Sequence, residues 1–357
     1  MTDVQSFELS GIARPVNVTA MLDEICEHFV EHAEVTRQED KAVLASSHAR
    51  IELLPKPDHL EIRLACGSDE ELESTRTMFA EHLYYFAGEE PFSLDWSKPA
   101  PKIQPANLQE AFVVSTAQVT PRMLRVTLSV EDVTPFVDGD IHVRLLVPPH
   151  GRAPVWPTLR ADGRIDWPKG EDKLLVRIYT IRSVDAAQGQ ITMDFFQHPA
   201  EGVSTPGADF ARDAIAGTRV AIIGPGGGSL PEAGKILFAG DESALPAIAR
   251  MIEEASPGTQ ITAIIEVENE AEEQAIISAA DISIEWLHRG SYLEGSKNRL
   301  AERAKAAIDR MPEDSYVWFA AEKAAMRSVK AHLASRGHDR KRQYVAWYWE
   351  EGKHADE

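Results

Sequence analysis

Hydrophobic and polar residues follow three different spacing patterns along this chain of 357 residues. The first 97 residues mix helical spacing of apolar positions with short alternating runs, which predicts a small α+β domain. Residues 98–106 are rich in proline and predict a linker. Apolar runs of period two fill residues 107–232 and predict a six-stranded antiparallel β-barrel. Strand-like and helix-like runs alternate over 233–357 and predict an α/β domain with a parallel sheet.

Two amphipathic helices are expected in the first domain. Thr19 is predicted to cap a helix that runs to about Ala33, and Ser68 a second one that runs to about Phe86. Short apolar runs predict strands at residues 42–45, 50–54, 59–65 and 91–96. His28 and His32 are four residues apart on the first helix, a spacing that can clamp a metal, but Glu27 and Glu31 beside them indicate a solvated face. We therefore expect no metal site there.

The barrel strands are predicted where apolar alternation recurs between turn residues. They cover residues 110–119, 123–128, 141–147, 174–184, 190–197 and 219–223. A proline-rich stretch, 147–173, separates the third strand from the fourth and also carries five cations, Arg152, Arg160, Arg164, Lys169 and Lys173. Loops of this kind often border active sites, so these cations are candidates for contact with an anionic substrate.

The last domain alternates between strands and helices. Strands are predicted at 235–239, 260–267, 282–287, 316–320 and 343–348, and helices at 247–255, 271–279, 300–308 and 324–336. Alternation at this spacing predicts a parallel sheet that binds its ligand at the carboxyl ends of the strands.

The net charge of −20 argues against a nucleic-acid-binding protein, whose surface would be basic. Residues 1–97 hold 7 Lys and Arg against 20 Asp and Glu, so most of this charge belongs to the first domain. Two cysteines are too few for a disulfide framework, and no apolar run approaches the roughly 18 residues of a membrane span. These features predict a cytoplasmic protein.

The strand with the most chemistry reads Arg177-Ile-Tyr-Thr-Ile-Arg182. Period two places Arg177 and Tyr179 on one face and Thr180 and Arg182 on the other. An aromatic ring, a hydroxyl and two guanidinium groups are what a flavin dinucleotide requires, because the ring stacks and arginine binds phosphate in bidentate fashion. An ordinary amphipathic strand with surface arginines is the alternative.

Further segments follow this strand in a characteristic order. They are Asp194-Phe-Phe-Gln-His198, Gly224-Pro-Gly-Gly227, Gly240-Asp-Glu-Ser-Ala-Leu-Pro246, Trp286-Leu-His-Arg289 and Tyr348-Trp349 with Gly352. With these motifs, residues 107–353 resemble the siderophore-interacting proteins, FAD-dependent ferric-siderophore reductases with a ferredoxin reductase-like layout. Residues 1–97 resemble a small domain of unassigned function that precedes such reductases. Phe210 stands where the family has tryptophan, and Glu350 where it commonly has arginine.

The resemblance implies specific roles. Tyr179 packs on the isoalloxazine ring, Thr180 hydrogen-bonds near its reactive edge, and Arg177 or Arg182 holds the pyrophosphate. The other residues implied in cofactor binding are His198, Gly202, Ser204, Thr205, Gly240, Asp241, Glu242 and Ser243. The alternative for His198 is a strand-end histidine with a backbone partner, and for Ser204 and Thr205 simple turn chemistry.

Glu266 and Glu268 fall at the end of the second strand of the predicted parallel sheet. An acidic side chain at this position suits a ribose diol and repels a 2′-phosphate. We therefore expect NADH rather than NADPH as the nicotinamide cofactor.

The implied reaction passes a hydride from the nicotinamide to FAD and single electrons from FAD to Fe(III) in a siderophore, which releases the iron as Fe(II). Ferredoxin stays open as an electron donor. Outside the proline-rich stretch, Arg289, Lys297 and Lys353 are further candidates to attract the siderophore complex. Two other functions also remain open: a general NAD(P)H:flavin or quinone oxidoreductase, and a non-enzymatic module that senses flavin or iron.

Overall fold

The computed structural model describes residues 7–30, 33–197, 205–291 and 299–352. The chain forms two compact units. The first consists of Met1–Leu108 together with Pro148–Leu174, and the second of Gln109–Val147 together with Leu175–Glu357. The stretch between the third and fourth barrel strands therefore packs with the first domain.

The first unit is built on a six-stranded antiparallel sheet of order β2-β3-β4-β5-β1-β6. Its strands are β1 (Phe7–Arg14), β2 (Glu34–Arg37), β3 (Ala42–Ala45), β4 (Ala49–Pro55), β5 (Leu60–Cys66) and β6 (Ser93–Trp96). Along β5 buried and less buried residues alternate, as expected for a sheet with one covered face. The predicted strands at 42–45, 50–54, 59–65 and 91–96 are confirmed to within two residues, whereas the sequence pattern had not revealed β1 and β2.

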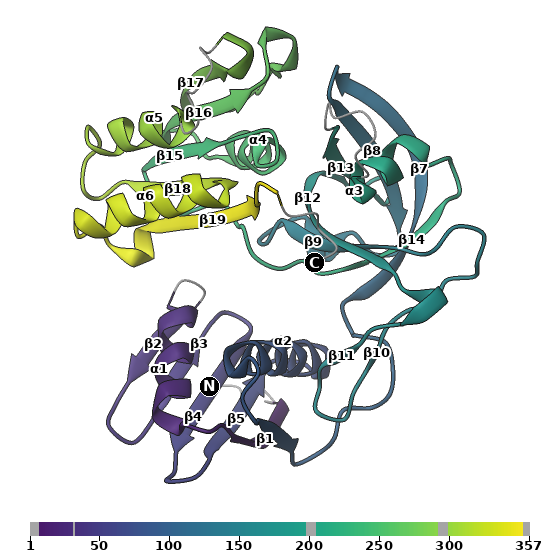
Figure 1. Ribbon diagram of the computed structural model, residues 1–357, viewed down its shortest axis with the longest axis vertical. Coiled ribbons are helices and arrows are strands. Elements are labelled where there is room, and N and C mark those ends of the chain that lie inside the picture. Colours follow the sequence, from purple (N-terminus) through teal and green to yellow (C-terminus); the bar gives the residue numbers. More distant parts are fainter. Residues whose placement is uncertain (1–6, 31–32, 198–204, 292–298, 353–357) are drawn as a thin grey trace. The chain divides into compact units, whose positions relative to one another are not determined.

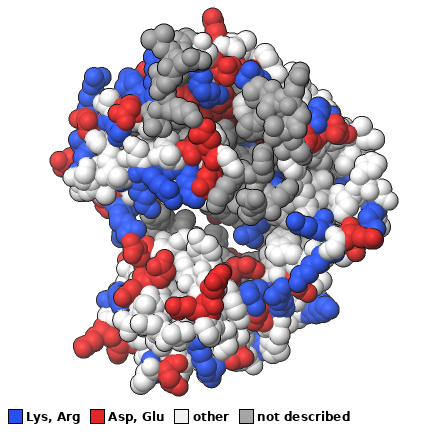
Figure 2. All heavy atoms as spheres, in the orientation of Figure 1, with Lys and Arg blue, Asp and Glu red and all other residues white. Residues whose placement is uncertain are grey.

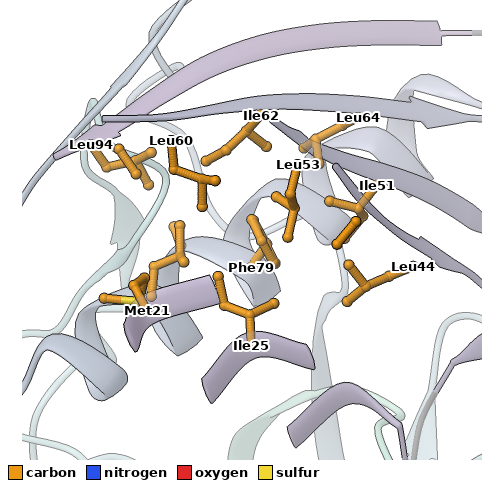
Figure 3. Packing of buried hydrophobic residues seen from close by; sticks show 14 of the residues in the cluster. Met21, Ile25, Leu44, Ile51, Leu53, Leu60, Ile62, Leu64, Phe79 and Leu94 are labelled. Atoms are coloured by element: carbon orange, nitrogen blue, oxygen red, sulfur yellow. The ribbon is translucent and has the colours of Figure 1, made fainter. Parts of the chain in front are cut away.

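Two helices, α1 (Val18–Phe29) and α2 (Asp69–Ala87), bury their apolar sides against this sheet. Figure 3 shows side chains of both helices, such as Ile25 and Phe79, meeting side chains that project from the strands, such as Leu53. The Ser68 hydroxyl accepts from the amide of Glu71, which confirms the predicted cap of α2. The prediction that Thr19 caps α1 is wrong. The side chain of Asn17, two residues earlier, accepts from the amide of Ala20, because from this position it reaches the free N–H groups of the first helical turn.

The second unit begins with a closed antiparallel barrel, which confirms the predicted six strands. They are β7 (Leu108–Thr120), β8 (Met123–Val130), β9 (His142–Val147), β12 (Leu175–Asp185), β13 (Gln190–Phe196) and β14 (Arg219–Ile223). Around the barrel the order is β12-β13-β8-β7-β14-β9. Inward residues such as Val126, Ile181 and Met193 are fully buried, and the short helix α3 (Pro206–Asp213) packs against this interior through Ala211.

A five-stranded parallel sheet completes the second unit (Figure 1). Its strands, in the order β17-β16-β15-β18-β19, are β15 (Lys235–Gly240), β16 (Gln260–Val267), β17 (Asp281–His288), β18 (Tyr316–Glu322) and β19 (Gln343–Trp349). Helix α4 (Leu245–Glu254) covers one face, and α5 (Arg299–Ile308) and α6 (Lys323–Ser335) cover the other. The chain winds outward in both directions from β15 and β18, so the topological switch point lies between them. Ligands of such sheets bind at the carboxyl ends of the strands there.

The helix predicted at 271–279 is wrong. Only Glu270–Glu272 form a 3₁₀ turn, and an irregular segment follows. The buried carboxylate of Glu272 accepts hydrogen bonds from the Thr120 hydroxyl (2.5 Å) and the Arg122 amide (3.2 Å) of the barrel. These tertiary bonds outweigh a helix propensity of a few tenths of a kcal/mol per residue. The remaining 3₁₀ turns are η1 (Thr134–Phe136), η2 (Gly170–Asp172), η4 (Arg289–Ser291) and η5 (Arg340–Arg342).

Candidate functional site

Tyr179 lies on the inner side of β12, at the edge of the barrel core. Its ring packs at 4.2 Å, centroid to centroid, on Phe195, and the side chain remains partly exposed. A Cβ atom at Gly207 would overlap the Tyr179 hydroxyl, so only glycine allows α3 to approach this closely. Burial raises the pKa of the Tyr179 hydroxyl, which therefore stays protonated and available as a donor.

Thr180 points to the opposite side of β12 and is buried. It stands across from His142 in the antiparallel pair that β12 forms with β9. His142 Nδ1 donates to the carbonyl oxygen of Gly227 at 3.0 Å, and Nε2 accepts from the Tyr348 hydroxyl at 2.8 Å. Burial raises the pKa of Tyr348 and lowers that of His142, so the phenol keeps its proton and the imidazole is neutral. The end of β19 is thereby attached to the barrel beside Thr180.

The two arginines of the motif occupy different environments. Arg182 is 7% exposed, and its guanidinium forms a bidentate ion pair with Glu253 of α4, at 2.5 and 2.6 Å. This pair joins the barrel to the parallel sheet domain. Arg177 is less buried, and one of its amino groups donates to the carbonyl oxygen of Val176 at 2.7 Å. Of the two predicted phosphate ligands, Arg182 is thus the one that Glu253 engages in bidentate fashion.

The turn after β15 lies at the switch point. Gly240 stands beside Ala320 of β18, and a Cβ on it would lie 2.6 Å from the Ala244 Cβ atom and 2.8 Å from the Ala320 carbonyl oxygen. One oxygen of Asp241 accepts from the amide and hydroxyl of Ser243, at 2.9 and 2.5 Å. Its other oxygen accepts from the indole N–H of Trp349 at 2.7 Å. The hydrogen bond from Trp349 therefore links the turn after β15 to the end of β19.

Carboxylates from neighbouring strand ends converge on one arginine. Arg289, just after β17, forms ion pairs with Glu242 and with Glu266 (3.1 Å), and its Nε lies 3.8 Å from Glu268. Burial raises the pKa of Glu242 to about 7 in spite of this cation, and burial also raises the pKa of Glu266. Arg122 also pairs with Glu268 at 3.1 Å, so three carboxylates face two guanidinium groups at this edge of the sheet.

The cations predicted to attract substrate are largely neutralised within their own neighbourhoods. Arg152 pairs with Glu171 and Asp172, Arg160 with Asp166, and Arg164 with Asp162. Figure 2 shows acidic and basic side chains similarly interspersed on one face. At the sheet edge, Lys323 pairs with Glu350 at 2.8 Å and its Nζ lies 5.0 Å from the Trp347 ring centroid. Glu350, which replaces the family's common arginine, therefore neutralises a neighbouring lysine.

Several predicted residues lie outside the described part of the chain: His198, Gly202, Ser204, Lys297, Lys353 and His32. Thr205 directly precedes α3, where its amide donates to the Asp209 carboxylate at 3.1 Å. His28 contacts the rings of Phe29, Phe86 and His82. Among the described residues, we find no group of three metal-ligating side chains and no helix with the length and apolarity of a membrane span.

The sequence alone did not identify three contributors to the site: His142, the Tyr348 hydroxyl as its partner, and Arg250. Tyr348 belonged to a recognised motif, but nothing in the sequence shows that it meets His142, which lies 206 positions away. Arg250, for which no role was predicted, is 2% exposed and donates to the carbonyl oxygens of Ile181 and Phe136, both at 2.8 Å.

The residues on β12 suit an FAD molecule. They offer a partly exposed aromatic ring with a protonated phenol, a hydroxyl across from His142, and the guanidinium of Arg177 in addition to that of Arg182, which pairs with Glu253. A ring for stacking and a cation for phosphate are the donor set of a flavin dinucleotide site. The barrel, the parallel sheet and this site define a flavin-dependent oxidoreductase.

Comparison with known proteins agrees with this class. Residues 112–229 match the siderophore-interacting FAD-binding domain, and 233–352 match the siderophore-interacting protein domain. Residues 15–97 match a family described as an uncharacterized protein conserved in bacteria. The chain belongs to the siderophore-interacting protein family, which confirms the resemblance seen in the sequence.

Three similar proteins illustrate the relationship. The crystal structure of a siderophore utilization protein from T. fusca is 32% identical, covers 69% of this chain and 94% of its own, and has a TM-score of 0.58. An uncharacterized protein of Mycobacterium tuberculosis is 31% identical over 260 residues, 68% of this chain and 89% of that one. The ferric vibriobactin reductase ViuB of Vibrio cholerae is 27% identical over 248 residues, 67% of this chain and 88% of its own length.

The contact between His142 and Tyr348 predicts a pH dependence of stability. The pKa of His142 is lowered from 6.5 in the folded state, so below pH 6.5 the unfolded chain binds a proton that the folded chain does not. Its stabilising contribution is complete above pH 6.5 and is lost as the pH falls toward the lowered value. Glu242, whose pKa is raised from 4.5 to about 7, acts in the opposite direction: its contribution is lost as the pH rises through that interval.

Comparison of the wild type with His142→Gln isolates the histidine, because Glu242 is the same in both. We expect urea unfolding to show the wild type losing stability relative to the variant between pH 6.5 and pH 5. Parallel stability curves for the two proteins over this interval would show that His142 is not held neutral in the folded state.

Proposed function

We propose that this protein is an FAD-dependent ferric-siderophore reductase that uses NADH to reduce Fe(III) in a siderophore complex to Fe(II), which releases the iron. The observation that carries the proposal is the series of contacts that joins Thr180 of β12 to the β15 turn. Thr180 stands across from His142, which accepts from Tyr348 of β19, and Trp349 of the same strand donates to Asp241 of the turn. The relatives named as ferric-siderophore reductases support the substrate class. An enzyme that depends on NADH works where the cell keeps that cofactor, so we place it in the cytoplasm.

The protein's own residues position and tune the cofactor. When bound, FAD supplies the conversion of a two-electron hydride donor into single-electron transfers to Fe(III). Tyr179 packs against the ring system, and Arg177 binds the pyrophosphate in preference to Arg182, which Glu253 already engages. Thr180 donates a hydrogen bond near the reactive edge of the ring, held there by the pairing of β12 with β9.

The nicotinamide cofactor approaches the turn of Gly240, Asp241, Glu242 and Ser243, and His198, Gly202, Ser204 and Thr205 line the FAD. No side chain is required as a nucleophile. Because Fe(III) binds hard oxygen ligands far better than Fe(II) does, reduction itself loosens the siderophore complex. The residues named above therefore act by placing electron donor and acceptor close together and by excluding water.

The decisive test is anaerobic reduction followed by reoxidation. Purified protein loaded with FAD is titrated with NADH, and the loss of flavin absorbance is followed. The bleached protein is then mixed in a stopped-flow instrument with a panel of ferric siderophores and a chelator of Fe(II). We expect flavin colour to return with formation of the Fe(II) chelate. Rapid reoxidation by free flavin or quinone, with no response to any ferric siderophore, would instead identify a general flavin or quinone reductase.

Cofactor choice gives a second prediction. The 2′-phosphate of NADPH would meet the carboxylates of Glu242, Glu266 and Glu268, whose shared cation Arg289 is already engaged. We expect kcat/KM for NADH to exceed that for NADPH at least about tenfold, which corresponds to 1.4 kcal/mol.

Glu266→Gln is expected to lower the ratio of kcat/KM for NADH to kcat/KM for NADPH. Glu285→Gln is the matched control, because Glu285 lies on β17 in an ion pair with Arg303 and should leave the ratio unchanged. Steady-state rates with both cofactors decide the question, and a clear preference for NADPH would refute the role given to these carboxylates.

A further inference from the structure

The stretch between β9 and β12, residues 148–174, belongs structurally to the first domain. Its two short strands, β10 (Thr158–Leu159) and β11 (Ile165–Asp166), pair with each other as a hairpin. The indole N–H of Trp96 donates to the carbonyl oxygen of Asp162 at 2.8 Å, and the amide of Ile165 donates to the Glu81 carboxylate at 2.8 Å. Trp96 ends β6 and Glu81 lies on α2, so two elements of the first domain form hydrogen bonds with the hairpin.

The linker after the first domain takes part in the same packing. The amide of Ala100 donates to the carbonyl oxygen of Ala161 at 3.1 Å, and the amide of Leu159 donates to that of Ile103 at 2.8 Å. Backbone bonds of this kind need no particular side chain, but they require both segments to be held in register. The linker therefore lies along the hairpin instead of running free.

Arg76 lies at the centre of this packing. Its side chain is fully buried, pairs with Glu73 and donates to the carbonyl oxygen of Lys98 at 3.2 Å. Gly163 at the hairpin turn has φ +90°, and a Cβ there would lie 3.0 Å from Arg76 Cγ. On the same surface the Arg164 guanidinium carbon lies 3.3 Å from the centroid of the Tyr84 ring. Side chains of α2, among them Arg76, Glu81 and Tyr84, thus form the surface on which the hairpin packs, which we call the seat.

The other end of this stretch leads directly into the flavin strand. Leu174 is buried, Leu175 begins β12, and Arg177 and Tyr179 follow within five residues of Leu174. We call residues 148–174 the insertion, because they interrupt the barrel between β9 and β12. Near its two ends, Arg152 pairs with Glu171 and Asp172. The pairing of β12 with β9 begins at Leu175, opposite Val147, at the two ends of this stretch. A held stretch lowers the entropy lost when these ends are brought together, so it favours the pairing at the start of β12.

We propose that the first domain, for which no chemistry was predicted, holds the barrel's own insertion and so fixes the start of β12 and the placement of Arg177 for FAD binding. The proposal rests on the proposed function, because it needs FAD to bind at β12. Trp96, Glu81 and Arg76 are then positioning residues, which act on the flavin through the insertion.

Two variants each remove one hydrogen bond between the first domain and the hairpin. Trp96→Phe removes the N–H donor and keeps an aromatic ring, and Glu81→Ala removes the acceptor for Ile165. Glu52→Ala is the matched control, since Glu52 pairs with Arg50 on β4 of the same domain. If Trp96→Phe lowers the yield of folded protein, Glu81→Ala alone carries the test.

Two readouts are taken on the full chain. Trypsin cleavage after Arg152, Arg160, Arg164, Lys169 or Lys173, mapped by mass spectrometry, reports how firmly the insertion is seated. The Kd for FAD, from flavin fluorescence during titration, reports on β12. We expect both variants to be cleaved in the insertion at least about tenfold faster than the wild type and to bind FAD about fivefold more weakly, with Glu52→Ala unchanged in both readouts.

The proposal fails if cleavage accelerates while the Kd for FAD stays at the wild-type value, because the first domain would then hold the insertion without affecting the flavin. It also fails if neither readout changes. Failure of the proposed function looks different: the wild type itself would then bind no FAD, or would not be reoxidised by ferric siderophores, whatever trypsin reveals about the insertion.

Discussion

Replacing Arg177 by alanine is expected to weaken FAD binding about 10- to 100-fold. A hydrogen bond to a charged partner contributes about 1.5–3 kcal/mol, and each 1.4 kcal/mol corresponds to a factor of ten in Kd. Arg177 lies on the flavin strand, and Glu253 does not compete for it as it does for Arg182. The Kd is measured by titration of the apoprotein with FAD.

Arg219→Ala is the control for this experiment. Arg219 also lies on a barrel strand, where its guanidinium is held by Glu110 at 2.6 Å, so its loss removes the same charge and should leave FAD binding within about twofold of the wild type. If Arg177→Ala retains FAD while Arg182→Ala loses it at unchanged stability, the pyrophosphate is bound by Arg182 and our choice between the two arginines is wrong.

The second large effect is expected at Arg250, which we predict stabilises the joint between barrel and parallel sheet. The buried guanidinium donates to the carbonyl oxygens of Ile181 and Phe136 and pairs with Glu254 at 2.7 Å. Arg250→Met keeps the volume but leaves two carbonyl groups of the barrel without this donor. An unsatisfied buried polar group costs about 1–3 kcal/mol, so we expect the free energy of unfolding of this unit to fall by about 3 kcal/mol.

Urea unfolding followed by circular dichroism and by flavin fluorescence measures this loss. Because Ile181 directly follows Thr180, we also expect FAD to be released at a lower urea concentration than in the wild type. Glu254→Gln is the matched control: the Glu254 side chain is 44% exposed, so the change should cost less than about 1 kcal/mol. An Arg250→Met protein as stable as the wild type would mean that the joint does not depend on this side chain.

Arg250, Glu253 and Glu254 lie three and four positions apart on one side of α4, and each takes part in an ion pair or hydrogen bond at this joint. From the sequence alone they look like the polar face of an amphipathic helix. Arg250 and Glu253 instead bond to polar groups of β12, the flavin strand, and Glu254 pairs with Arg250, because the barrel packs against this helix. The same residues that stabilise the second unit thus support the strand that carries Tyr179 and Thr180.

The sequence by itself determined the elements whose pattern is local. The six barrel strands follow from apolar alternation, since a strand with one face toward a core must alternate whatever lies around it. The cap at Ser68 follows from the short reach of a side chain to the next helical turn. The flavin strand and the family were also recognisable, because their motifs are short and occur in a fixed order.

Only the tertiary structure decided the partners that come from distant parts of the chain. It engaged Arg182 with Glu253, placed His142 beside Tyr348, bound Glu272 to the barrel where a helix was expected, and seated residues 148–174 on the first domain. The physical reason is common to all four cases. A charge or hydrogen-bonding group takes whichever partner the folded chain brings within about 3 Å, and local periodicity carries no information about that partner.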